Sequence, residues 1–145
     1  MTVEDIMDLT FAKININSSL KDLSDYFYEN NTEYLLVVDD KDIVIGEVSV
    51  LDYMMAAFPE YARKFEKLSF MKRFEPFENL LKNEKDIKLE TIIKPITGKV
   101  TPQTTIHDAV FLMSKLGRQE LPIIKNNHPI GIISIVDIYK KVIKG

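Results

Sequence analysis

Apolar positions in the first 58 residues follow periods that predict strand, helix, strand, strand, helix. The extended segment "AKININ" precedes a helical pattern in which Leu20, Leu23 and Phe27 share one face. Two apolar runs, "YLLVV" and "IVIGEV", follow with a short polar turn between them, which predicts a hairpin. A second helix is predicted over residues 50–58.

The same order of elements returns after residue 88. "GKVTP" is the extended segment, and Ile106, Ala109 and Met113 share one face of the next helix. "ELPII" and "PIGIIS" form the predicted hairpin, and residues 135–143 form the closing helix.

These two halves are copies of one unit. When the chain is shifted by 86 residues, the segment from Val3 lies on the segment from Leu89 without a gap. After the turn "DDKDIVIG", which is one residue longer than "KNNHPIG", the shift becomes 85 and "GEVSVLD" at 46–52 matches "GIISIVD" at 131–137. Such internal similarity is typical of repeated structural units. The chain therefore divides into repeat 1 (residues 1–58), an insertion (59–88) and repeat 2 (89–145).

The repeats predict an α+β fold. A three-stranded sheet with helices on one face leaves its other face apolar and unburied, so one repeat alone would be marginally stable. Two repeats packed sheet to sheet around a pseudo-two-fold axis remove that problem.

The insertion at 59–88 is rich in aromatic residues and too long for a bare loop. We expect helices at about 60–68 and 75–83, on either side of Pro76. The segment could form a dimer interface or a flap over a cleft, or it could pack against its own module.

The phrase shared by both repeats carries the candidate chemistry. Gly46 and Gly131 lie near a strand end, where a missing side chain lets a flat ligand approach the backbone. Ser49 and Ser134 open the following helix, so their hydroxyls and the first free N–H groups can face an anion or a sugar hydroxyl.

The phrase ends in Asp52 or Asp137, one helical turn after the serine. A carboxylate there can accept hydrogen bonds from both hydroxyls of a ribose. The alternative is a capping box, in which the aspartate only satisfies backbone donors. The upstream glycine and the repetition favour a ligand site, and both roles can coexist.

The tandem order of elements, with "VTPQTTIHDAVFLM", "LPII" and "GIISIVD", resembles the cystathionine β-synthase (CBS) domain, and the pair resembles a Bateman module. The resemblance covers nearly the whole chain outside residues 59–88. It implies a regulatory module that binds AMP, ADP, ATP or S-adenosylmethionine in clefts between the repeats. It implies no chemistry and no required cofactor, and the serine and aspartate positions serve phosphate and ribose in the family.

The sequence departs from that family after the serines. Nucleotide-binding members often place a basic residue there to meet phosphate charge. This chain has Val50 and Ile135, which weakens the case for ATP. Arg118 could supply a substitute charge, although an arginine after a helix end is usually solvated surface.

The repeats also differ in their first extended segments. Repeat 2 has Thr101 and Pro102 where repeat 1 has Asn15 and Ile16. We count Thr101, Pro102 and Asn15 among the candidate ligand-binding residues. If only one cleft is competent, we expect it to be the cleft lined by Thr101, Ser134 and Asp137.

The composition of the chain limits which other classes of protein it can belong to. With 46% hydrophobic and 28% charged residues the chain should fold, and no cysteine and only two histidines make a metal cluster implausible. The net charge is −3 and basic residues are scattered among acidic ones, so we expect neither nucleic-acid nor membrane binding. The acidic N-terminus and the lack of a long apolar run favour the cytoplasm. The carboxylates of "DDKD" at 39–42 read as a solvated turn or a weak divalent-cation site.

We therefore expect a homodimeric sensor of an adenosine compound whose ligand-stabilised arrangement is read by a regulated protein. One rival is a dimerisation or docking module whose clefts are filled by side chains such as Tyr61 or Phe70. The other rival is a small nucleotide hydrolase, against which stands the lack of a cysteine, a nucleophile–histidine pair or a metal cluster.

Overall fold

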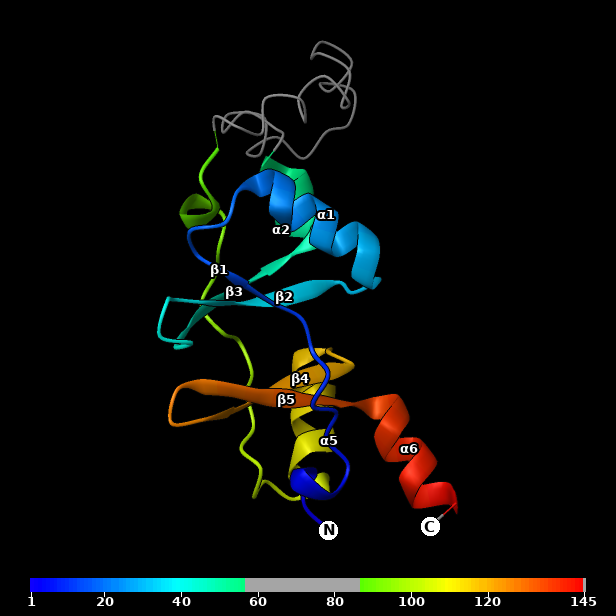
Figure 1. Cartoon of the computed structure of the whole chain (residues 1–145). Coiled ribbons are helices and arrows are strands. Elements are labelled where there is room, and N and C mark those ends of the chain that lie inside the picture. The colour runs from blue at the N-terminus through cyan, green and yellow to red at the C-terminus, as the bar shows by residue number, and fades with distance from the viewer. Residues whose placement is uncertain (57–86, 145) are drawn as a thin grey trace, which may run out of the picture.

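The structure is a computed structural model that describes residues 1–56 and 87–144. Its elements confirm the α+β order predicted for both repeats, which stack as two layers (Figure 1). The helices predicted at 60–68 and 75–83 lie outside the described residues. Repeat 1 contains η1 (Val3–Asp5), β1 (Lys13–Asn15), α1 (Leu20–Asn30), β2 (Tyr34–Val38), β3 (Val44–Ser49) and α2 (Val50–Ala56). Repeat 2 contains η4 (Leu89–Thr91), α5 (Ile106–Leu116), β4 (Glu120–Lys125), β5 (His128–Ser134) and α6 (Ile135–Lys144).

The three-stranded sheet predicted for each repeat forms in repeat 1 only. There β1 pairs parallel with β2, and β2 pairs antiparallel with β3. In repeat 2 the β4–β5 hairpin forms, but the third strand is reduced to a single bridge between Val100 and Ile123.

Two prolines explain this difference. Pro102 and Pro122 stand where repeat 1 has Ile16 and Leu36. The N–H of Ile16 donates to Val38 O at 2.8 Å and extends the first ladder, whereas proline has no N–H to donate. The third strand of repeat 2 is therefore too short to continue beyond its bridge.

The core of each repeat includes a residue from the segment that begins the other repeat. Val3 of η1 is fully buried with Ala109, Leu121 and Ile133 of repeat 2. Leu89 of η4 is buried in the core of repeat 1. Fully burying one such side chain contributes roughly 1.5–3 kcal/mol, so each repeat depends on the other for stability.

Backbone hydrogen bonds continue this exchange of segments. Asp8 and Ile132 each donate an N–H to the other's carbonyl at 2.9 Å, and Glu47 and Lys94 do the same at 2.8 Å. Residues 1–8 therefore lie in space with repeat 2, although in sequence they begin repeat 1. The division at residues 58 and 89 describes the repeats in sequence and not the two packed bodies.

A third buried layer lies between the sheets. Leu36 and Val38 on β2, and Pro122 and Ile124 on β4, are buried but belong to neither core. Side chains alternate along a strand, so these residues face away from the helices. Figure 1 shows the two sheets with those faces opposed, as the sequence predicts.

Tyr34 ties the layers together near the pseudo-two-fold axis. Its hydroxyl donates to Glu120 O at 2.6 Å, and the two residues occupy equivalent positions 86 residues apart. Burial raises the pKa of Tyr34 more than the nearby Arg118 lowers it, so the phenol stays protonated and can donate.

Candidate functional site

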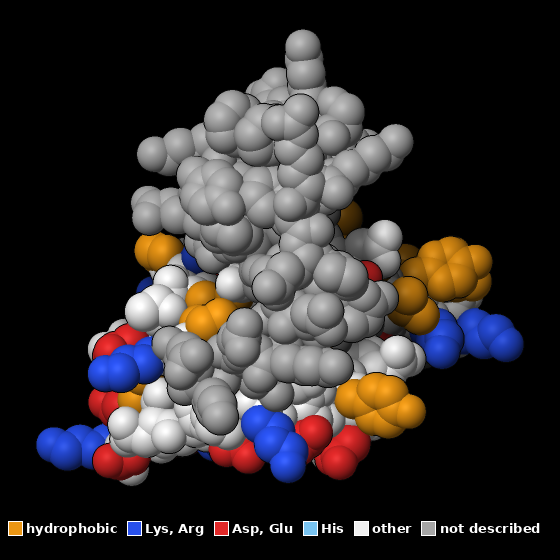
Figure 2. Space-filling model, turned by 90° about the horizontal axis from the view of Figure 1, so that it is seen from above, with side chains coloured by type: hydrophobic (Ala, Val, Ile, Leu, Met, Phe, Trp, Pro, Cys, Tyr) orange, Lys and Arg blue, Asp and Glu red, His pale blue; other side chains and the backbone are white. Residues whose placement is uncertain are grey.

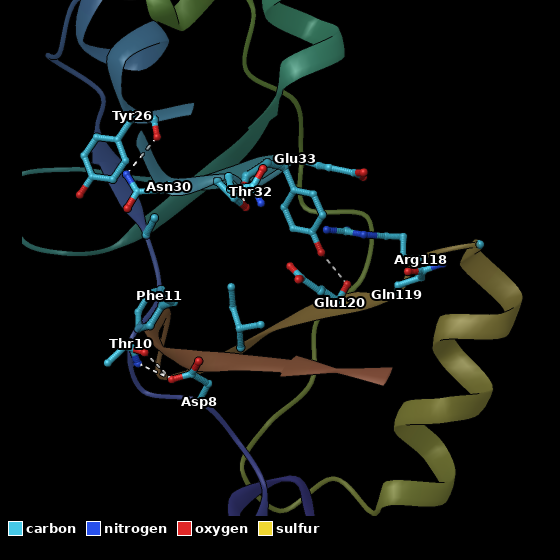
Figure 3. Close-up of a pocket in the computed structure, with 15 residues that line it drawn as sticks. Asp8, Thr10, Phe11, Tyr26, Asn30, Thr32, Glu33, Arg118, Gln119 and Glu120 are labelled. Carbon is cyan, nitrogen blue, oxygen red and sulfur yellow. Dashed lines mark hydrogen bonds between the residues drawn. The ribbon is translucent and has the colours of Figure 1, made fainter. Parts of the chain in front are cut away.

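A cavity of about 880 Å³ lies between the repeats on one side of the pseudo-two-fold axis. We call it the open cleft. Residues from the stretches 8–12, 30–34 and 117–120 line it, together with Tyr26 and Ile132. Figure 3 shows Thr10 and Phe11 on one side, Tyr26 and Asn30 above, and Arg118 and Glu120 on the far side. A space of this size is typical of sites for small molecules.

The first wall is the segment that crosses from η1 to β1. Asp8 Oδ1 accepts hydrogen bonds from Thr10 N at 2.8 Å and Thr10 Oγ1 at 2.6 Å. These hydrogen bonds lower the pKa of Asp8, so the carboxylate stays charged. Because the backbone of Asp8 is bonded to Ile132, the turn places Thr10 and Phe11 against the cavity.

The neighbouring strand β5 leads from the lining to the shared phrase of repeat 2. Ile132 of β5 lines the cavity, and Ser134 lies two residues further on the same face of the strand. Ser134 Oγ accepts from Asp137 N at 3.1 Å, which is half of the expected capping box. Within residues 1–56 and 87–144, the Asp137 carboxylate makes no hydrogen bond or ion pair.

Asp137 is not among the residues that line the open cleft, but Ser134, one helical turn before it, pairs with Glu120, which does line it. Burial raises the pKa of Glu120, Glu33 and Asp137 raise it further, and Arg118 opposes them. Glu120 reaches into the cavity from the start of β4 (Figure 3). The side of the open cleft nearest repeat 2 is therefore acidic.

The equivalent position on the other side of the axis is bridged by side chains. Glu47 stands where symmetry places Ile132, and its Oε2 lies 3.2 Å from Arg118 Nη1. Arg118 Nη1 also donates to Thr97 Oγ1 at 2.9 Å, and its guanidinium carbon lies 4.2 Å from the ring centre of Tyr34. We call this the bridged cleft.

Arg118 was interpreted from sequence as solvated surface or a charge for phosphate. Its side chain is only 14% exposed and that of Glu47 is 12% exposed. The ion pair is therefore largely removed from water, and the prediction that Arg118 is solvated surface is wrong. A glutamate 71 residues away gives no local sign that it will pair with this arginine.

In repeat 1 the shared phrase forms the complete capping box. Ser49 N donates to Asp52 Oδ2 and Asp52 N donates to Ser49 Oγ, both at 2.9 Å. Asp52 Oδ1 also lies 2.6 Å from Lys94 Nζ. Burial pushes the pKa of Asp52 up, but the hydrogen bonds from Lys94 and Ser49 outweigh it and leave the pKa lowered. The capping interpretation therefore accounts fully for Asp52, whereas Asp137 keeps a free carboxylate in the described structure.

The two glycines are explained by the chain itself. A Cβ on Gly46 would lie 2.8 Å from Lys94 O, and one on Gly131 would lie 2.6 Å from Asp8 O. The close approach predicted for a ligand is thus made by the exchanged backbone segments.

Of the ten predicted ligand residues, Arg118 alone lines the open cleft. Thr101, Pro102 and Asn15 are three of those that do not. Val100 pairs with Ile123, so the next residue, Thr101, lies toward the far end of β4, whereas Ser134 pairs with Glu120 at its start. At about 3.3 Å per residue this separation exceeds 10 Å along the strand. The expected grouping of Thr101 with Ser134 and Asp137 is therefore corrected.

Local bonds account for these three residues. Thr101 N donates to Thr104 Oγ1 at 3.0 Å, and the carbonyl of the buried Pro102 accepts from Glu4 N at 3.0 Å. Asn15 Nδ2 donates to Asp40 Oδ1 at 3.0 Å. They hold turns and the exchanged η1 segment in place.

The sequence interpretation missed Thr10, Phe11, Glu33 and Glu120. A usable signal was present in the alignment of the repeats, because Asp8 falls on Lys94 and Thr10 on Ile96. These positions carry opposite charge or polarity in the two copies. Which cleft each of these residues lines depends on the exchange of segments between the repeats, and the repeat pattern alone does not show that exchange.

The carboxylates of the turn at 39–42 are engaged by the chain itself. Among the described residues, no three acidic, histidine or cysteine side chains are placed to hold a metal ion. Asp39 Oδ1 accepts from Lys41 N and Ile43 N, and Asp42 is paired with Lys13 at 2.6 Å. The solvated-turn reading fits these contacts.

On the face in Figure 2, basic and acidic side chains are interspersed around the rim. The scattered charge expected from the sequence is visible there. Across the described ranges, no helix is both long and apolar enough to cross a membrane.

The sequence profile of the CBS domain matches residues 3–58 and 87–144, which are the two repeats. The chain belongs to the CBS domain family. The resemblance seen in the repeated phrase is thus confirmed. No curated protein matches the chain in sequence.

Solved structures with the same fold are CBS domain proteins. A CBS domain-containing protein from Kribbella flavida shares 16% identity over 100% of this chain and 99% of its own, with a TM-score of 0.76. CBSX2, solved in complex with AMP, shares 20% identity over 99% and 96%, with a TM-score of 0.71. The CBS domain pair of the protein MJ0100, in complex with 5′-methylthioadenosine and S-adenosyl-L-methionine, shares 16% identity over 99% and 97%, with a TM-score of 0.67. These CBS pairs have the fold of this chain.

Proposed function

We propose that this CBS pair binds one adenosine-containing ligand in the open cleft and responds by a change in the arrangement of its repeats. The observation that carries the proposal is the contrast between two equivalent sites. One is bridged by Arg118 and Glu47, while the other is a cavity of about 880 Å³ lined by Glu120. Glu120 pairs with Ser134, and the Asp137 carboxylate, one helical turn beyond Ser134, makes no hydrogen bond or ion pair among the described residues. A partly buried carboxylate without such a partner is suited to accept hydrogen bonds from a ligand.

The lining residues provide complementary surfaces for such a ligand. Phe11 and Ile132 offer apolar area in the lining, against which a purine ring can pack. Asp137 can accept from both ribose hydroxyls, with Ser134 holding the start of α6 in place. Two structural neighbours were solved with AMP, or with 5′-methylthioadenosine and S-adenosyl-L-methionine, which supports an adenosine ligand here.

The exchanged segment offers a route for the response. Asp8 and residues 10–12 line the open cleft, and the same segment carries Val3 into the core of repeat 2. A ligand that contacts both Thr10 and Asp137 would favour one placement of this segment against β5. Differential affinity for two arrangements is sufficient to signal, and the proposal includes no chemical turnover.

We further propose that the protein acts as a cytoplasmic homodimer read by a regulated protein. Four apolar side chains of α6 are 52–63% exposed: Val136, Tyr139, Val142 and Ile143. Leu51 of α2, the equivalent of Val136, is 67% exposed. Such apolar helix faces are suited to contact another copy. Sedimentation of wild type and Tyr139→Glu tests this, with a smaller species expected for the variant.

The test of the ligand is calorimetric titration and thermal shift of ligand-free protein. The panel contains AMP, ADP, ATP, S-adenosylmethionine, 5′-methylthioadenosine and GTP. A ligand at about 100 times its dissociation constant adds roughly 2.7 kcal/mol of stability, which raises the melting temperature by several degrees. We expect at least one adenosine compound to bind and GTP to have no effect.

Asp137→Asn should remove binding while leaving the protein folded. Asp108→Asn is the matched control, because Asp108 is also acidic, lies in the first turn of a helix of repeat 2 and is exposed. Equal loss in both variants, or no binding of any adenosine compound, would favour the rival docking module. Release of nucleotide products during the titration would favour the hydrolase.

A further inference from the structure

The open cleft differs in charge from its bridged counterpart. Asp8, Glu33, Glu120 and Arg118 are the charged residues that line it, which gives a formal charge of 1 − 3 = −2. The position equivalent to Asp8 on the other side of the axis is Lys94. The pseudo-two-fold symmetry is therefore broken in favour of negative charge at the open cleft.

The single basic residue of the lining is already neutralised. Arg118 Nη1 lies 3.2 Å from Glu47 Oε2 and donates to Thr97 Oγ1 at 2.9 Å, both on the bridged side. Its guanidinium also stacks on Tyr34. Moving Arg118 to a phosphate would leave Glu47 largely buried and without its cation, which is costly.

Three further side chains of the lining use a hydrogen-bond donor within the protein. Thr10 Oγ1 donates to Asp8, Thr32 Oγ1 donates to Tyr34 O, and Asn30 Nδ2 donates to Tyr26 O. The side-chain amides of Asn31 and Gln119 also line the cavity, but they carry no charge that would offset that of the carboxylates.

The start of α6 is equally poor in donors. A helix N-terminus attracts phosphate through its first free N–H groups. Here Ile135 N donates to Gln119 O at 2.8 Å and Asp137 N donates to Ser134 Oγ at 3.1 Å. Two of the first three N–H groups are therefore unavailable to an anion.

From this excess of negative charge we propose that the open cleft selects adenosine ligands whose 5′ substituent carries no phosphate and is neutral or cationic. A phosphate only accepts hydrogen bonds above its second pKa and is repelled by the carboxylates. A thioether is tolerated, and a sulfonium or ammonium group is attracted. This inference rests on the proposed adenosine site and narrows its ligand class.

The experiment is a calorimetric comparison of 5′-methylthioadenosine with AMP at pH 7.5, because the two differ only in the 5′ group. We expect 5′-methylthioadenosine to bind at least about tenfold more tightly, equivalent to roughly 1.4 kcal/mol. S-adenosylmethionine should bind more tightly than S-adenosylhomocysteine, which lacks the sulfonium charge. Both differences should shrink as sodium chloride is raised from 50 to 500 mM, since salt screens exposed charges.

Two substitutions should reverse the preference. Asp8→Lys places at the open cleft the charge that Lys94 carries on the other side, and Glu120→Gln removes a carboxylate without changing shape. Each should improve AMP relative to 5′-methylthioadenosine by about fivefold or more, whereas the exposed helix variant Asp108→Asn should leave the ratio unchanged.

The outcomes separate the two proposals. If AMP binds wild type as tightly as 5′-methylthioadenosine, the charge selection is wrong while the adenosine site stands. Unchanged ratios in both Asp8→Lys and Glu120→Gln would likewise overturn the selection. If ligand-free, folded wild type binds none of the four compounds, the adenosine site itself is rejected, and the selection with it.

Discussion

Asp52 Oδ1 lies 2.6 Å from Nζ of Lys94, and no such pair forms at the equivalent position of the other repeat, where Asp8 stands in place of the lysine. The Asp52 side chain is 8% exposed and that of Lys94 is 65% exposed. One shared phrase thus ends in a carboxylate with a structural role, and the other ends in a carboxylate that is free within the described structure.

The first prediction follows from that contrast. Asp52→Ala removes a helix cap and the partner of Lys94, and we expect a loss of about 1–2 kcal/mol of unfolding free energy. Lys94→Met should cost less than Asp52→Ala, about 1 kcal/mol, because Ser49 N still donates to the carboxylate that loses its cation. Asp137→Ala should cost about 0.5 kcal/mol or less, since its carboxylate makes no bond in the described structure. Urea unfolding measures all three, and equal losses for Asp52→Ala and Asp137→Ala would contradict the assignment.

The exchanged segments predict a large effect of the smallest possible substitutions. Gly46→Ala and Gly131→Ala would each force a methyl group to within 3 Å of a backbone carbonyl. We expect each to destabilise the protein by roughly 2 kcal/mol or more, because the backbone bonds to Lys94 or Asp8 must break or shift. Thermal unfolding is the measurement, with the exposed Ile45→Ala on the same strand as a control. A glycine variant as stable as wild type would show that the segment is not held there.

Coupling between Arg118 and Glu47 is the third prediction. Arg118→Met leaves a largely buried carboxylate unpaired and should cost about 3 kcal/mol, while Glu47→Gln should cost less. The double variant should be more stable than the sum of the single losses predicts, by about 1–3 kcal/mol. A double-mutant cycle from urea unfolding gives this coupling energy. Additive losses would mean that the pair is not formed in solution.

A fourth prediction concerns the dependence of stability on pH. The pKa of Glu120 is raised in the folded protein, so the folded state binds its proton more tightly than the unfolded state does. The stability that protonated Glu120 contributes is full below the unfolded pKa, and it is lost as the pH rises through the higher folded pKa. Glu120→Gln should therefore gain stability relative to wild type between acidic pH and pH 7.

The pKa of Asp52 shifts in the opposite direction, so Asp52 serves as the comparison. Its pKa is lowered in the folded protein, so its contribution is present above the unfolded pKa and lost as pH falls through the lower folded value. Asp52→Asn should therefore differ most from wild type at pH 7 and least near pH 2. Parallel pH profiles for the two variants would refute these assignments.

Much of the fold could be predicted from the sequence because its signals are local. The periods of apolar residues set both hairpins and all four long helices of the described ranges, and the matched phrases showed that one unit occurs twice. The opposed apolar sheet faces required the repeats to stack. The local signal was weakest in the third strand of repeat 2, which Pro102 and Pro122 shorten.

The site depended on contacts that no local pattern encodes. Serine and aspartate at capping distance are the same in both copies, yet Lys94 occupies one carboxylate and Asp8 stands at the equivalent place beside the other. The repeated sequence predicted two equivalent candidate positions for a ligand. Only the tertiary structure decided which position is open, because the segments before each repeat cross to the other repeat and bring opposite charges to sites that the sequence alone presents as alike.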